Sequence, residues 1–126
     1  MIELMQNLPD GVVGIEAVGK VTSDDYAVVT PSIERALAMR EKIRLIHVLG
    51  RRFTGFTAGG LWQDGKLGLA HATSFERIAV VTDLDSVRTL VRAGGWSAPG
   101  EMRLFSNAER DDAVAWVSAD LEQAKA

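Results

Sequence analysis

The chain alternates along its length between two hydrophobic periods, and this alternation restricts it to one class of fold. Short runs rich in apolar and β-branched residues predict strands, and they are separated by segments with apolar residues at helical spacing. The predicted strands cover residues 2–6, 12–18, 43–49, 77–81 and 102–105. The resulting order, β-β-α-β-α-β-α-β-α, predicts an α/β domain with helices packed on a mixed β-sheet.

Two features of this order predict how the strands pair. Pro9, Asp10 and Gly11 form a tight turn, because proline presets one backbone angle and glycine tolerates a positive φ. The first two strands should therefore pair antiparallel. Each later strand is joined to the next through a helix, and such crossovers are right-handed and give parallel neighbours. We expect a parallel inner sheet with one antiparallel edge hairpin.

Three helices are expected to begin at capping boxes. In this motif a serine or threonine and an acidic residue three positions later satisfy backbone amides at the helix start. The pairs are Thr22 with Asp25, Thr82 with Asp85, and Ser106 with Glu109. Pro31 interrupts the first helical pattern, so we expect a kink or a restart there, with Thr30 as a second cap.

Apolar residues at helical spacing mark the faces that should contact the core. They are Tyr26, Val29, Ile33 and Leu37 in the first helix, Leu84, Val87, Leu90 and Val91 in the third, and Ala113, Val114, Val117 and Leu121 in the last.

The composition fits one domain spanning residues 1–126, because hydrophobic residues make up 47% and charged residues 25%, as in globular proteins with a buried core. The net charge of −3 argues against nucleic-acid binding, which needs a basic face. The chain has no cysteine, no leader-like start and no apolar run near the ~20 residues of a membrane span. The expected location is the cytoplasm.

Residues 51–72 combine bulky apolar side chains with glycines. Each glycine inside a helix costs roughly 1 kcal/mol relative to alanine, so we expect a loop and then a weakly stable helix that packing holds or that moves. The segment follows the carboxyl end of a predicted strand, where ligands bind in doubly wound folds. The candidate ligand-binding residues are Phe53, Phe56, Leu61, Trp62 and Leu69, with Arg51 and Arg52 beside them. Alternatively, the aromatic residues only fill the core under a loose helix.

The sequence predicts neither a catalytic nor a metal site. Without cysteine, a nucleophile would be a serine or threonine with a histidine base, and the chain has two histidines. His47 falls within a buried strand and is expected to be a core histidine with one satisfied hydrogen bond. His71 falls near a helix end, and neither has a carboxylate at metal-ligand spacing. We expect no enzyme, metal or cofactor; a hydrolase-like site would need a hydroxyl beside one of these histidines.

Several short segments are spaced in a characteristic order along nearly the whole chain. They are GIEAVGKVT at 14–22, DY at 25–26 followed by Pro31, WQD at 62–64, FERIAVV at 75–81, PGE at 99–101 running on to Phe105, and AW at 115–116. This ordered set resembles the SpoIIAA-like family, a branch of the STAS domains. The resemblance implies a STAS-like fold with the element order given above.

The resemblance implies an interaction or sensing module. Those STAS domains that antagonise anti-sigma factors carry a phosphorylatable serine in an Asp-Ser-Ser/Thr-Gly motif, at the place that residues 50–57 occupy here. Thr54 followed by Gly55 echoes this motif, but the Asp-Ser pair is absent, so a phospho-switch is not predicted and modification of Thr54 or Thr57 stays open. The SpoIIAA-like branch is also similar in architecture to CRAL-TRIO lipid-transfer domains, which implies a non-polar ligand or membrane association.

Two functional hypotheses follow from the residues and the resemblance. In the first, residues 53–69 form a movable lid over a non-polar or lipid-like ligand, with peripheral association at a membrane. In the second, the chain is a STAS-type protein-interaction module that regulates a protein partner without a small-molecule ligand. A homodimer is expected in either case, because apolar surface on a small domain is often closed by self-association.

Overall fold

The computed structural model describes residues 1–70, 73–94 and 101–120. Its elements are, in chain order, β1 (Ile2–Leu4), β2 (Val12–Val21), η1 (Ser23–Val28), α1 (Val29–Met39), β3 (Ile43–Phe56), α2 (Ala58–Ala70), β4 (Phe75–Thr82), α3 (Asp85–Gly94), β5 (Glu101–Phe105), η3 (Asn107–Glu109) and α4 (Arg110–Ser118). Here η marks a 3-10 helix. This succession confirms the predicted β-β-α-β-α-β-α-β-α order and the α/β class.

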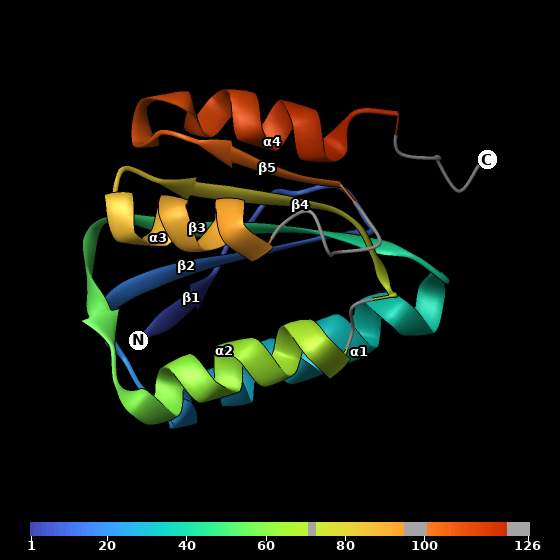
Figure 1. Ribbon diagram of the computed structural model, residues 1–126. Coiled ribbons are helices and arrows are strands. Elements are labelled where there is room, and N and C mark those ends of the chain that lie inside the picture. The colour runs from blue at the N-terminus through green and yellow to red at the C-terminus, as the bar shows by residue number, and fades with distance from the viewer. Residues whose placement is uncertain (71–72, 95–100, 121–126) are drawn as a thin grey trace.

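The five strands form one mixed sheet in the order β1-β2-β3-β4-β5. β1 pairs antiparallel with β2, and β2, β3, β4 and β5 pair parallel to one another. The antiparallel edge hairpin and the parallel inner strands are therefore both confirmed. Helices cover both faces of the sheet, with α1 and α2 on one side and α4 on the other (Figure 1).

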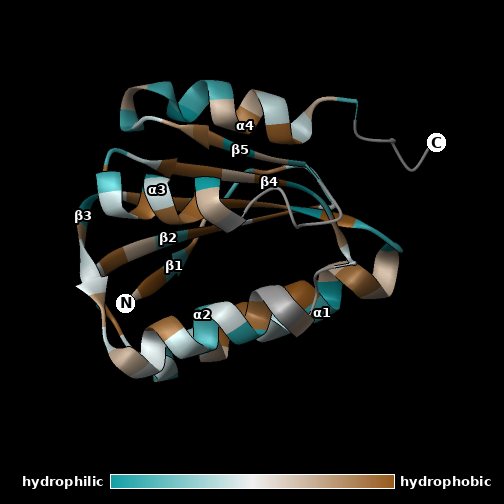
Figure 2. Ribbon diagram, viewed as in Figure 1, coloured by the Kyte–Doolittle hydropathy of each residue, from teal (hydrophilic) through white to brown (hydrophobic). Residues whose placement is uncertain are grey.

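The sheet separates two apolar cores, and β3 contributes to both. Leu45 and Leu49 belong to the core under α1, α2 and α3, whereas Ile46 and Val48 belong to the core under α4. This division follows from the alternation of side chains along a strand. Hydrophobic residues accordingly line the strands between the helix layers (Figure 2).

The helix starts agree with the capping predictions in two places. Thr22 and Asp25 form a capping box at η1, and Ser106 and Glu109 form one at η3. The predicted restart at Thr30 is misplaced, because α1 already begins at Val29 and Thr30 lies inside it. Pro31 then falls in the first helical turn, where the backbone amides have no intrahelical acceptor and a missing N–H costs little.

The predicted core face of α3 is only half correct. Val87 and Val91 pack against the core, but Leu90 is 63% exposed and Leu84, which precedes the helix, is 41% exposed. Val87 and Val91 are four residues apart, so they lie on one narrow face of the helix that packs on the core. Leu90 lies beside this face. In α1 the buried face is as predicted, and in α4 Ala113 and Val117 are fully buried. Leu121 lies outside the described residues.

Strand β3 is longer than predicted. The sequence indicated an end at residue 49 with a loop beyond it, but β3 runs to Phe56 and stays paired with β2. The pairing shifts register around Gly19, whose φ is +63°, and Gly55 has a φ of +141°. Glycine permits both angles, so the strand continues through irregular backbone that single-sequence patterns do not predict as strand.

Candidate ligand site around helix α2

The structure divides the predicted aromatic segment between a strand and a helix. Phe53 and Phe56 belong to the end of β3, whereas Leu61, Trp62 and Leu69 belong to α2. Phe53 is only 9% exposed, and its ring meets that of Phe56 edge-on with 5.1 Å between centroids. Both rings contact the core that α1, α2 and α3 cover, so they form an apolar floor at this end of the sheet.

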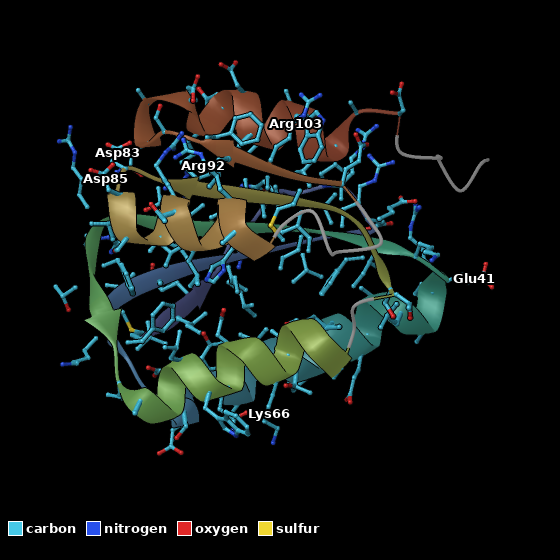
Figure 3. All side chains as sticks on the ribbon, viewed as in Figure 1. Glu41, Lys66, Asp83, Asp85, Arg92 and Arg103 are labelled. Atoms are coloured by element: carbon cyan, nitrogen blue, oxygen red, sulfur yellow. The ribbon has the colours of Figure 1, made fainter. Side chains whose placement is uncertain are left out.

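Helix α2 carries apolar residues on its outer surface as well. Leu61 is 50% exposed and Trp62 is 69% exposed. Lys66, one helical turn beyond Trp62, points away from the sheet (Figure 3), so these two residues share the solvent face. Leu67 packs against the core instead. The side chain of Leu69 lies outside the part of the chain that the structure describes.

The start of α2 is fastened to the end of β2 by backbone contacts. The Thr57 amide donates to the Val21 carbonyl at 2.8 Å, and the Thr57 hydroxyl accepts from the Gly60 amide at 2.9 Å. A Cβ on Gly60 would lie 2.3 Å from the Val21 carbonyl oxygen. The helix can approach so closely only because residue 60 is glycine.

A side-chain hydrogen bond joins the middle of α2 to η1. The Tyr26 hydroxyl of η1 donates to the Asp64 carboxylate at 2.7 Å. Burial of the ring, together with the negative charge of Asp64, raises the pKa of Tyr26 far above its ordinary value. The phenol therefore stays protonated and keeps donating throughout the physiological range.

The two arginines of the predicted site lie away from the aromatic floor. Arg51 and Arg52 line a polar recess of about 390 Å³, together with Arg110, and Val48 and Val81 of the α4-side core line it too. Arg52 contacts Glu3 at 3.1 Å and Glu16 at 3.4 Å. The structure thus brings Phe53, Phe56 and Leu67 of α2 into one core but places both arginines in the recess on the other face, where Arg52 lies beside carboxylates.

A larger groove lies in a place that the sequence patterns did not predict. It measures about 690 Å³ and runs between the connection of β1 to β2 and helix α1. Leu4, Leu8 and Met39 are among its lining residues, and Met39 is 85% exposed. Sequence reasoning missed this groove because it depends on how a turn and a helix pack, and neither segment is unusual by itself.

His47 is buried in the sheet, as the sequence indicated. It is 9% exposed, and its Nε2 atom has no hydrogen-bond partner. His71 lies outside the described residues. Across residues 1–70, 73–94 and 101–120, no group of three or more histidine, aspartate or glutamate side chains is placed to hold a metal ion. No helix in the same part of the chain has the length and apolar character to cross a membrane.

These features define a class of protein. In the described part of the chain, a mixed five-stranded sheet with four α-helices in this order is the architecture of a STAS-type module. The SpoIIAA-like family model matches residues 12–118, so the chain belongs to the SpoIIAA-like family.

A solved structure supports the same assignment. It is the crystal structure of an uncharacterized protein from the DUF3478 family with a SpoIIAA-like fold, from Shewanella loihica PV-4. The two proteins share 30% sequence identity, and the match covers 93% of this chain and 92% of that one with a TM-score of 0.74. Curated proteins gave no significant match.

Proposed function

We propose that this domain is a non-catalytic binding module that holds a non-polar, lipid-like molecule beneath a lid formed by residues 58–69, the helical part of the predicted segment 53–69. Helix α2 is the moving part, and the apolar floor at Phe53 and Phe56 is the contact surface for the ligand. The observation that carries the proposal is the exposure of Leu61 and Trp62 on a helix that also closes the core.

The composition of α2 supports its role as a lid. Four of its 13 residues are glycines, and each lowers the stability of the isolated helix by roughly 1 kcal/mol relative to alanine. The helix therefore depends on its contacts with neighbouring elements. Among the described contacts these are the Val21 and Thr57 anchor, the Tyr26–Asp64 hydrogen bond and the packing of Leu67. Opening of α2 would break these contacts and leave the strands paired, so the helix can open without unfolding the sheet.

The outer face of α2 supports association with a membrane surface. Tryptophan is favoured where apolar chains meet polar headgroups, and Lys66 on the same face would attract anionic lipids. Inserting Leu61 and Trp62 would hold α2 at the bilayer while the rest of the domain stays in water. A ligand could then move between the bilayer and the apolar floor.

Native mass spectrometry of gently purified protein tests the proposal. We expect extra mass on the folded protein that is lost when the same sample is denatured. A Tyr26→Phe variant should retain less of this mass, because the lid opens more often. If the folded and denatured samples show the same protein mass, and loading with lipid extract adds nothing, the proposal is wrong.

The second candidate is a STAS-type protein-interaction module without a small-molecule ligand. The same exposed Leu61 and Trp62 favour it, because contiguous apolar side chains on a surface also suit a protein partner. Under this function α2 stays closed and its outer face is the binding surface. Capture of one partner by the wild type but not by Trp62→Ala, with no ligand mass, would favour this candidate.

A further inference from the structure

His47 occupies the centre of the sheet on the face that α1, α2 and α3 cover. Ile15 of β2 and Val80 of β4 flank it in register, and Leu45 and Leu49 lie on the same face of β3. All four of these side chains are apolar, and each is 7% exposed or less. The imidazole is therefore a polar group whose nearest neighbours within the sheet are apolar.

The Nε2 atom of His47 is unsatisfied. It is buried without a hydrogen-bond partner in the described part of the chain. A buried polar atom of this kind loses its bond to water and gains nothing in return, so it destabilises the folded protein. Arg44, another buried polar residue of β3, shows the contrast, because it is bonded to Glu76 and to the Val117 carbonyl on the opposite face. Burying Nε2 without a hydrogen bond has an explanation if a bound ligand supplies the missing hydrogen-bond partner.

The position of His47 places this atom within reach of the proposed ligand site. His47 and Phe53 lie on the same strand and contact the same core, and the six residues from one to the other span at most about 20 Å. A long hydrocarbon chain can cover that distance. Its tail would contact Phe53 and Phe56 under α2, and its polar end would reach the centre of the sheet.

The surroundings of His47 also restrict the polar end of the ligand. Burying a carboxylate here would be costly, because the flanking residues Ile15 and Val80 offer no positive charge. A hydroxyl group is uncharged, and it both donates and accepts hydrogen bonds. It can therefore pair with Nε2 whether or not this atom carries a hydrogen.

We propose that Nε2 of His47 is the hydrogen-bonding anchor of the ligand site, and that the ligand is a long-chain, uncharged alcohol. This inference rests on the lid function proposed above and adds the chemical class of the ligand. It also explains why a histidine occupies a position where leucine would pack without an unsatisfied atom.

Binding of three probes with the same carbon chain tests the inference. The probes are 1-tetradecanol, tetradecane and tetradecanoate, delivered from cyclodextrin to the full chain and measured by native mass spectrometry. The wild type should bind the alcohol about three- to tenfold more tightly than the alkane, the usual net effect of one hydrogen bond. It should also bind the alcohol more tightly than the carboxylate.

Two variants separate an anchoring role from a structural one. His47→Leu should bind the alcohol and the alkane equally and should melt at the same temperature as the wild type or higher. His47→Gln should keep most of the preference for the alcohol, because its amide still forms a hydrogen bond.

The possible failures are distinguishable. Equal binding of alcohol and alkane by the wild type, or a preference that survives His47→Leu, would overturn the anchor while the lid function stands. A clear drop in the melting temperature of His47→Leu would show that the imidazole serves the fold instead, which also overturns it. If the wild type binds none of the three probes, the anchor and the lid function are both wrong.

Discussion

The hydroxyl of Tyr26 donates a hydrogen bond to the carboxylate of Asp64 over 2.7 Å, and this contact ties η1 to the middle of α2. The two residues are 38 positions apart in the chain. Tyr26 is 4% exposed, so its ring is fixed in the core while its hydroxyl reaches the helix. This hydrogen bond therefore stabilises a glycine-rich helix whose own sequence has a low helix propensity.

Replacing Tyr26 with phenylalanine should loosen α2. The change removes one hydrogen bond to a charged group and should lower the free energy of unfolding by about 1–2 kcal/mol in urea titration. Amide hydrogen exchange should increase in α2 more than in β3 or β4. Asp64→Asn is the control, because it keeps an acceptor for the phenol and should lose less. Equal exchange in α2 for wild type and Tyr26→Phe would show that the bond does not hold the helix.

Two glycines of α2 should respond oppositely to the same substitution. Gly60→Ala places a Cβ 2.3 Å from the Val21 carbonyl oxygen, so the helix start must shift and stability should fall by more than about 1 kcal/mol. At Gly65 no atom beyond the chain neighbours and the helix's own backbone lies within 4 Å of such a Cβ. Gly65→Ala should therefore stabilise the protein by about 0.5–1 kcal/mol through helix propensity alone. Urea unfolding of both variants measures this, and a similar effect of both would contradict the close approach of residue 60.

The exposed tryptophan of α2 should matter for binding but not for folding. Trp62→Ala should change the free energy of unfolding by less than about 0.5 kcal/mol, because the side chain is 69% exposed. It should reduce co-flotation with vesicles of mixed neutral and anionic phospholipid. Leu90→Ala on α3 is the matched control, since Leu90 is 63% exposed on another helix. An equal loss of flotation in both variants would assign the effect to general hydrophobicity.

Stability should fall in acid because of Asp25. The hydrogen bond that its carboxylate accepts from the Thr22 amide outweighs partial burial and lowers the pKa of Asp25 below its ordinary value. A lowered pKa in the folded state gives stability that is present above the unfolded-state value, about 4, and is lost as the pH falls below it. Thermal melts at pH 7 and pH 3 measure this loss.

Asp25→Asn supplies the comparison for the acid experiment. The variant should be less stable than the wild type at pH 7, because an amide accepts the Thr22 hydrogen bond less strongly than a carboxylate. The difference between the two proteins should shrink at pH 3, because below its ordinary pKa the carboxyl takes up a proton in the unfolded state and the advantage of the wild type falls. An unchanged difference at both pH values would exclude Asp25 as a source of the acid effect.

Local patterns in the sequence predicted most of the fold. The strand and helix order, the antiparallel hairpin and the capping boxes at Thr22 and Ser106 depend on neighbours a few positions apart, so the printed sequence contains them. The same holds for the buried faces of α1 and α4. The family resemblance agrees with the match over residues 12–118.

The tertiary structure decided what depends on distant partners. β3 continues beyond residue 50 only because β2 pairs with it through irregular backbone around Gly19 and Gly55, and no local pattern encodes that partner. Leu90 is apolar yet exposed, because α3 packs on the core through Val87 and Val91 and Leu90 lies beside that stripe. The separation of Arg51 and Arg52 from the aromatic floor, and the unsatisfied nitrogen of His47, likewise come from packing. Sequence thus determined which elements form, whereas packing across the sheet determined which side chains meet.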